Sequence, residues 1–136
     1  MLKKGILPLA VSISLVLSAC NSQQTSVDRN ARHVAQEIAQ NHFDPNTRPL
    51  TADNIRVMKP VMQQFYDIGK RDQASGMTPV QAMERAHLIG TSGIIQGGDK
   101  AMYAGQTYTV DDPITQQKMI AKGATASYLD GYNGVP

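Results

Sequence analysis

Apolar residues recur at the spacing of one helical face between about Asp28 and Asn41. They stand three or four residues apart, as on the buried side of an amphipathic helix, and are Ala31, Val34, Ala35, Ile38 and Ala39. Asp28 is the predicted N-cap, because its carboxylate can accept hydrogen bonds from the free amides of the first turn. The following segment, from Asp44 to Pro49, predicts a loop, since Pro45 disfavours helical backbone at the residue before it.

A second helix is predicted over apolar residues that run from Ile55 to Ile68, and it continues to about Ser75. It starts either between Thr51 and Asn54 or at Pro60. Proline is accepted in the first turn of a helix and kinks the helix interior, so the pattern leaves both starts open.

The third helix has a sharply marked start. Gly76 ends the preceding helix, Thr78 caps the new one, and Pro79 takes the first helical position. Gln81 follows Thr78 by three residues and completes a capping box. The residues expected to face inward are Val80, Met83, Ala86, His87 and Ile89 or Gly90.

The last part of the chain predicts one more helix. Gly97 and Gly98 interrupt the helical pattern, and the segment from Tyr103 to Val110 has weak strand character. Asp112 and Pro113 then repeat the cap-and-proline signal. The expected inward residues are Ile114, Ile120, Ala121, Ala124, Tyr128 and Leu129. The sequence therefore predicts a mostly all-α protein, a small bundle of about four helices with a possible short strand near 103–110.

The first 19 residues have the organisation of a secretory signal peptide. Lys3 and Lys4 form a basic start, an apolar run from Ile6 to Leu17 follows, and small residues precede Cys20. The run is about 12 residues long, whereas a membrane-spanning helix needs roughly 20. Pro8 also argues against a long regular helix.

The tetrapeptide Leu17-Ser18-Ala19-Cys20 resembles the lipobox of bacterial lipoproteins. The resemblance implies cleavage between Ala19 and Cys20 and attachment of a diacylglyceryl group to the Cys20 thiol, with palmitate-type acyl chains anchoring the protein in membrane lipid. In that family an Asp directly after the cysteine retains the protein in the inner membrane. The residue here is Asn21, so the resemblance implies the outer membrane of the cell envelope.

These boundaries divide the chain into a signal peptide (1–19), a lipidated N-terminus with a polar tether (20–28) and a helical envelope domain (29–136). The single cysteine allows no internal disulfide. Loss of Lys3 and Lys4 with the signal lowers the 13 basic residues to 11, equal to the 11 acidic ones. A neutral mature chain without a basic stripe argues against binding to nucleic acid.

A hairpin between the second and third helices, Phe65 to Pro79, is the most patterned stretch of the mature chain. Its glycine, its capping threonine and its basic residues near a helix C-terminus all have structural explanations. The functional alternative is a protein-contact surface formed by Tyr66, Lys70, Arg71 and Asp72.

This hairpin and the tail Tyr128-Leu129-Asp130-Gly131-Tyr132 resemble the corresponding parts of the plasmid entry-exclusion lipoproteins, which pair a lipobox with a short helical domain. The resemblance implies an envelope protein that hinders uptake of a related plasmid, and it implies no catalytic residues.

Residues with catalytic or metal-binding potential are few. His33 and His42 are nine residues apart, which is not the spacing that places two metal ligands on one helix face, while His87 can pair with Glu84. The glycine-rich stretch from Gly90 to Lys100 lacks the residue order of a phosphate-binding loop. We therefore expect a non-catalytic domain that contacts an envelope protein and needs no cofactor, metal or small-molecule ligand. The alternative is a small envelope enzyme that uses a histidine–carboxylate pair.

Overall fold

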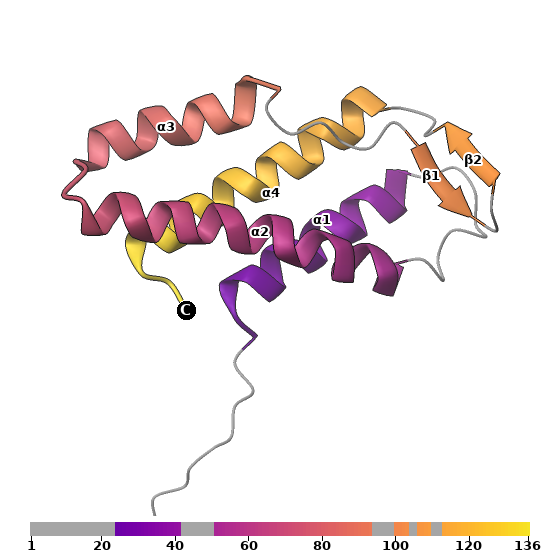
Figure 1. Ribbon diagram of the computed structural model, residues 1–136, viewed down its shortest axis with the longest axis horizontal. Coiled ribbons are helices and arrows are strands. Elements are labelled where there is room, and N and C mark those ends of the chain that lie inside the picture. Colours follow the sequence, from indigo (N-terminus) through magenta and orange to yellow (C-terminus); the bar gives the residue numbers. More distant parts are fainter. Residues whose placement is uncertain (1–23, 42–50, 94–99, 104–105, 110–112) are drawn as a thin grey trace, which may run out of the picture.

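A computed structural model describes residues 24–41, 51–93, 100–103, 106–109 and 113–136. Four helices form a small bundle (Figure 1): α1 (Ser26–Asn41), α2 (Thr51–Ala74), α3 (Pro79–Thr91) and α4 (Pro113–Asn133). Two short strands, β1 (Lys100–Tyr103) and β2 (Gln106–Thr109), pair antiparallel, with Lys100 opposite Thr109. The predicted helical bundle is confirmed. The strand predicted near 103–110 corresponds to β2, and β1 was not predicted.

The core of the bundle consists of two hydrophobic clusters that share α2 and α4. In the first cluster α1 packs against both of these helices, and its buried members are Val27, Ala31, Val34, Ile38, Met62 and Ile120. In the second, α3 packs against α4, and its buried members are Ala82, Ala86, Ile89, Ala124 and Tyr128. Figure 1 shows α1 and α3 on opposite edges of this α2–α4 centre.

Two glycines allow the backbones of α2 and α4 to touch where they cross. A Cβ placed on Gly69 would lie 2.0 Å from the carbonyl oxygen of Tyr128, and one on Gly131 would lie 2.0 Å from that of Tyr66. Both positions fall inside the steric radius of the opposing backbone, so any side chain would push the helices apart. The glycine of the Tyr128–Tyr132 tail therefore has a packing role.

The start of α1 differs from the prediction. The helix begins at Ser26, and the Thr25 hydroxyl oxygen accepts from the Asp28 amide at 3.1 Å. Thr25 is thus the cap, and Asp28 lies in the first turn, where its charge suits the helix dipole. The predicted tether, residues 20–28, is shortened accordingly, because residues 26–28 are helical.

The same end of the bundle holds the last residues of the chain. Gly134 has a φ of 69°. The amides of Gly134 and Val135 donate to the carbonyls of Gly131 and Asp130, which closes α4 in a Schellman motif. The chain then returns to α1, where the Ser26 amide donates to the Pro136 carbonyl at 2.8 Å. The first and last parts of the domain are therefore joined.

The start of α2, which the sequence left open, lies at Thr51, so Pro60 is inside the helix. Proline cannot donate to the carbonyl four residues earlier, which belongs to Arg56. Both residues are exposed, so water can solvate the freed carbonyl.

The turn between α2 and α3 confirms the predicted hairpin. Gly76 has a φ of 82°, and the Met77 amide donates to the Asp72 carbonyl at 3.1 Å. The side chains and backbones of Thr78 and Gln81 form the predicted capping box, with Pro79 at the helix start.

The predicted inward face of α3 is confirmed at Ala86 and Ile89 and was wrong at Val80, Met83 and His87, which are exposed. Ala82, Ala86 and Ile89 are buried, whereas Val80 and Met83 are 77% and 60% exposed. Apolar residues lie on several sides of this helix, so periodicity alone does not select the side that packs. The small alanines face α4 because they let the two helices approach closely. In α4, Ile114 was also expected inside and is exposed, whereas Ile120, Ala124 and Tyr128 are buried as predicted.

Candidate functional site

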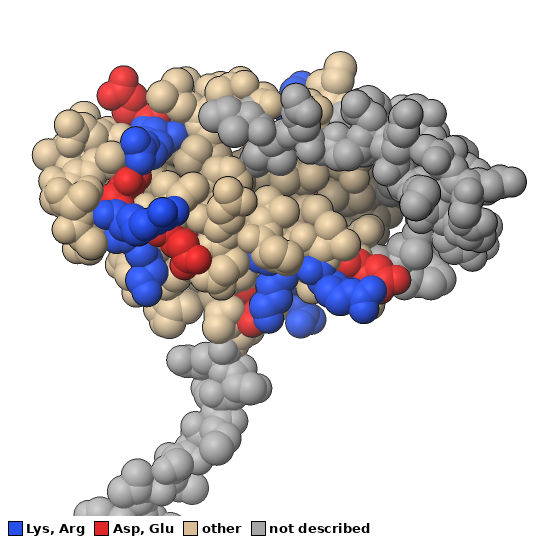
Figure 2. Space-filling model, viewed as in Figure 1, with Lys and Arg blue, Asp and Glu red and all other residues tan. Residues whose placement is uncertain are grey.

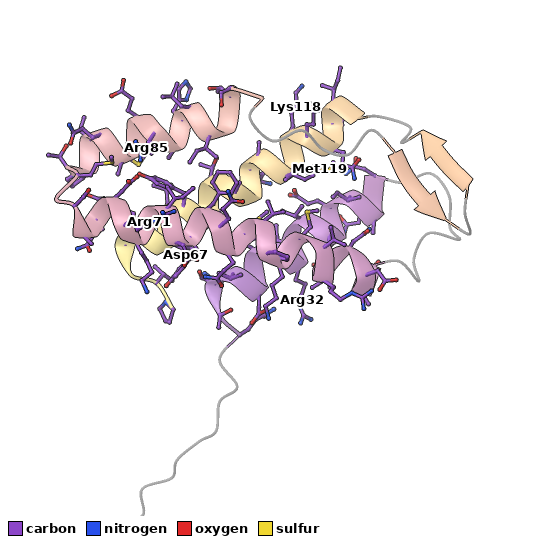
Figure 3. All side chains as sticks on the ribbon, in the orientation of Figure 1. Arg32, Asp67, Arg71, Arg85, Lys118 and Met119 are labelled. Atoms are coloured by element: carbon purple, nitrogen blue, oxygen red, sulfur yellow. The ribbon has the colours of Figure 1, made fainter. Side chains whose placement is uncertain are left out.

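The four residues of the predicted contact surface, Tyr66, Lys70, Arg71 and Asp72, differ in exposure and in their partners. Lys70 and Arg71 are exposed, and the Lys70 ammonium lies 5.9 Å from the centre of the Tyr66 ring. The Tyr66 hydroxyl donates to the Val135 carbonyl at 2.9 Å, so that side chain helps to hold the chain end. Arg71 folds back on its own helix, donating to the Asp67 carbonyl (Figure 3). Asp72 is buried, which removes it from the surface.

Asp72 joins three helices through its carboxylate. Both of its oxygens accept from Arg85 of α3 at 2.7 Å, and one accepts from the Tyr128 hydroxyl of α4 at 2.8 Å. We call Asp72, Arg85 and Tyr128 the clasp. A buried carboxylate is stable only when it is paired and hydrogen-bonded, and the clasp satisfies both conditions. Its geometry indicates a structural role.

Tyr128 is the titratable group most affected by the clasp. Its side chain is buried, and burial raises its pKa from 10.0 to about 12, with a further contribution from the hydrogen bond to the charged Asp72. Ionisation would place a second negative charge beside the Asp72 carboxylate on a buried side chain, which is why the pKa of the phenol is raised.

A second polar cluster joins the start of α1 to α2 and the end of α4. Lys59 pairs with Asp28, and this hydrogen bond, with a second from Thr25, lowers the pKa of Asp28. Arg29 and Asn30 both donate to Asp130, at 3.1 and 3.0 Å. In the view of Figure 2, basic and acidic side chains lie next to each other along the lower edge and at the left end. Charges of both signs are thus mixed at these two places, with no large area of one sign.

The histidines do not come together in the described part of the chain. His33 lies 4.0 Å from Glu37 on the exposed side of α1, and His87 is exposed on α3. His42, Cys20 and most of the glycine-rich stretch from Gly90 to Lys100 lie outside the described residues. Within those residues, no group of three or more His, Cys, Asp or Glu side chains is placed to hold a metal ion.

An open groove of about 420 Å³ lies between α3 and α4. We call it the α3–α4 groove, and its lining residues are Met83, Ala86, His87, Gly90, Thr91, Lys118, Lys122, Thr125 and Leu129. No sequence pattern predicts this groove, because Lys118 and Lys122 lie at least 27 residues after Thr91 and no local spacing connects them to α3.

Comparisons with known proteins leave the family open. No protein-family model, curated protein or solved structure matches the chain. Among the helices that the structure describes, none is long and apolar enough to cross a membrane.

Proposed function

We propose that the protein is a lipid-anchored bacterial envelope lipoprotein whose helical domain acts by contacting another envelope component. The observation that carries the proposal is Cys20 itself, the only cysteine, which stands directly after an apolar run and two small residues. Two or three acyl chains give stable anchoring where a single chain does not.

The position of the domain supports this proposal. Cys20 and Ser26 are six residues apart, and an extended chain covers at most about 3.5 Å per residue. The first helix therefore begins within about 20 Å of the anchoring sulfur. A domain this close to a bilayer, with its polar side chains used in pairs and caps, is suited to contacts beside the membrane.

The test is replacement of the lipidated sulfur. Cys20→Ser should abolish incorporation of labelled palmitate and release the protein from sedimented membranes, while Ser18→Ala keeps a small residue before the cleavage site and should leave both unchanged. Equal membrane association of the wild type and Cys20→Ser would overturn the anchoring proposal.

The outer membrane is the proposed destination because Asn21 follows the lipidated residue. Separation of the inner and outer membranes by density measures how the protein is distributed between them. Asn21→Asp should shift the protein to the inner-membrane fraction, and an unchanged distribution would contradict this destination.

Plasmid entry exclusion is the specific contact function that we propose. The two patches that resemble the entry-exclusion lipoproteins touch each other in the fold, since the Tyr132 hydroxyl donates to the Met77 carbonyl at 2.6 Å. Transfer of a related conjugative plasmid into recipients with and without the gene tests it. Expression should lower the transfer frequency, and the Cys20→Ser variant should restore it. An unchanged frequency would reject exclusion and leave the anchoring proposal standing.

A further inference from the structure

The side of α3 that borders the α3–α4 groove has the pattern of a buried helix face, although it is open. Met83, His87 and Gly90 line the groove at intervals of three or four residues, and Val80, which lies outside the lining, precedes Met83 by three. Val80 and Met83 are both largely exposed. A helix face with this periodicity normally packs against another element. Exposed apolar side chains grouped in this way mark an interaction site.

The α3–α4 groove has an apolar end and a basic end. The Thr125 hydroxyl oxygen lies 3.4 Å from the Ala86 carbonyl, and Tyr132 binds Met77, so the two helices run in opposite directions. Met83 therefore lies near Leu129 at one end. Lys118 and Lys122 occupy the other end, near Thr91.

The charge at the basic end is only partly neutralised. Lys122 pairs with Glu37 at 2.6 Å, but among the residues that the structure describes no acidic side chain lines the groove. Within the described part of the chain, Lys118 forms no ion pair, and Figure 3 shows it on the edge opposite Arg32. The exposed Glu84 of α3 lies outside the lining. The groove consequently favours a ligand with negative charge at one end and apolar groups at the other.

We propose that the α3–α4 groove binds an amphipathic helix of an envelope protein, in which acidic residues lie one to two turns from apolar anchors. On α4 the lining extends from Lys118 to Leu129, which at 1.5 Å per residue is about 16 Å, or three turns of a bound helix. Gly90 has no side chain and leaves room for the partner. This inference rests on the proposed function and names the kind of partner.

The position of the groove relative to the start of α1 favours a protein partner over a lipid surface. The start of α1, within about 20 Å of Cys20, lies on one long edge of the bundle and α3 on the other (Figure 1). The point where the tether joins the bundle is thus on the edge away from the groove, which favours a protein partner for the groove over the lipid of the anchoring membrane.

The test uses the full lipidated protein in its own envelope, with the photo-crosslinking residue benzoylphenylalanine in place of His87. The matched control carries it in place of Val57, which is 58% exposed on α2. An adduct should form at position 87 and not at 57, and mass spectrometry of the crosslinked peptide should identify a segment with apolar and acidic residues at helical spacing. A synthetic peptide of that segment should bind the purified protein, and Lys118→Glu should weaken binding by about tenfold, with less than about twofold for Arg32→Glu.

Four results would overturn the inference: no adduct at position 87, an adduct with lipid, a captured segment without acidic residues, or equal effects of Lys118→Glu and Arg32→Glu. Failure of the groove is distinguishable from failure of the anchor. If no adduct forms while labelled palmitate is still incorporated, only the groove proposal is rejected. If the Cys20→Ser protein stays on membranes and still forms the adduct, only the anchoring proposal is rejected.

Discussion

At the scale of single residues, the Asp72 carboxylate links three of the helices. It accepts from Arg85 and Tyr128, which come from two other helices, and the turn that follows it places Met77 beside the same tyrosine. Removing one partner of such a buried group costs more than an average hydrogen bond contributes, because the remaining polar atom loses its solvation without compensation. The stability of the α2–α3 hairpin on α4 is therefore sensitive to each member of the clasp.

The clasp predicts a specific loss of stability in alkali. In the unfolded chain Tyr128 ionises with an ordinary pKa of 10.0, while in the folded protein it stays protonated to about 12. The contribution of Tyr128 to the free energy of unfolding is complete below pH 10. It is lost as the pH rises to about 12, because the unfolded state releases the proton at a lower pH than the folded state. Denaturant unfolding at several pH values measures this loss.

Tyr128→Phe is the control for the alkaline loss. The variant should be less stable at neutral pH by about 1–3 kcal/mol, because Asp72 loses a donor, and its stability should fall less between pH 10 and 12. Parallel pH profiles for the two proteins would show that the phenol is not responsible.

At the scale of helices, the crossing of α2 and α4 depends on close backbone contact. Gly69 of α2 and Gly131 of α4 each face the backbone of the other helix. Gly123, also in α4, makes room for Val34 of α1, because a Cβ at this position would lie 2.2 Å from the valine methyl group. Glycine lowers helix propensity by about 1 kcal/mol relative to alanine. Three such residues within two helices are acceptable because the packing they permit compensates for that cost.

Gly131→Ala should destabilise the protein by about 2 kcal/mol or more, since the new methyl group meets the Tyr66 carbonyl rather than a movable side chain. The matched variant is Gly90→Ala in α3, whose Cβ would meet only the Thr125 hydroxyl at 3.4 Å. That change should leave stability unchanged or raise it by up to about 1 kcal/mol. Thermal unfolding compares the stabilities of the two variants. Equal changes in stability would contradict a close backbone contact between α2 and α4.

The helices could be predicted from local sequence, but their mutual packing could not. Caps, prolines and the glycine at 76 mark helix ends through bonds that span three to six residues, so the sequence alone located the α2–α3 turn. The partners of Asp72 are 13 and 56 residues away, and the partner backbone of Gly69 is equally remote. Nothing near Asp72 distinguishes a buried carboxylate from a surface one. The sequence therefore could not show that the Asp72 side chain is buried.

At the scale of the whole molecule, the two ends of the domain close on each other. The Ser26 amide binds Pro136, Tyr66 binds Val135, and the Arg29 guanidinium pairs with Asp130 at 3.1 Å. These bonds link α1, α2 and the end of α4 in one place. The bundle should therefore unfold as a unit, as expected for a domain with a shared core.

Removal of residues 135 and 136 tests this closure. The truncated protein loses the acceptors of Ser26 and Tyr66, and each hydrogen bond contributes about 1 kcal/mol. Its melting temperature should fall by several degrees. Tyr66→Phe, which removes one of the two bonds, should produce a smaller decrease, and an equal or larger decrease would contradict the closure.

The junction of Ser26 with Pro136 also governs how the protein can be labelled in living cells. A fluorescent reporter or affinity tag fused after Pro136 would lie beside the start of α1 and would pull on the residue whose carbonyl accepts from the Ser26 amide. The α2–α3 turn at Ser75 and Gly76 is exposed and makes no contact with Ser26 or Pro136 in the hydrogen bonds of the described residues, so a short epitope inserted there would be accessible to antibody without pulling on that bond.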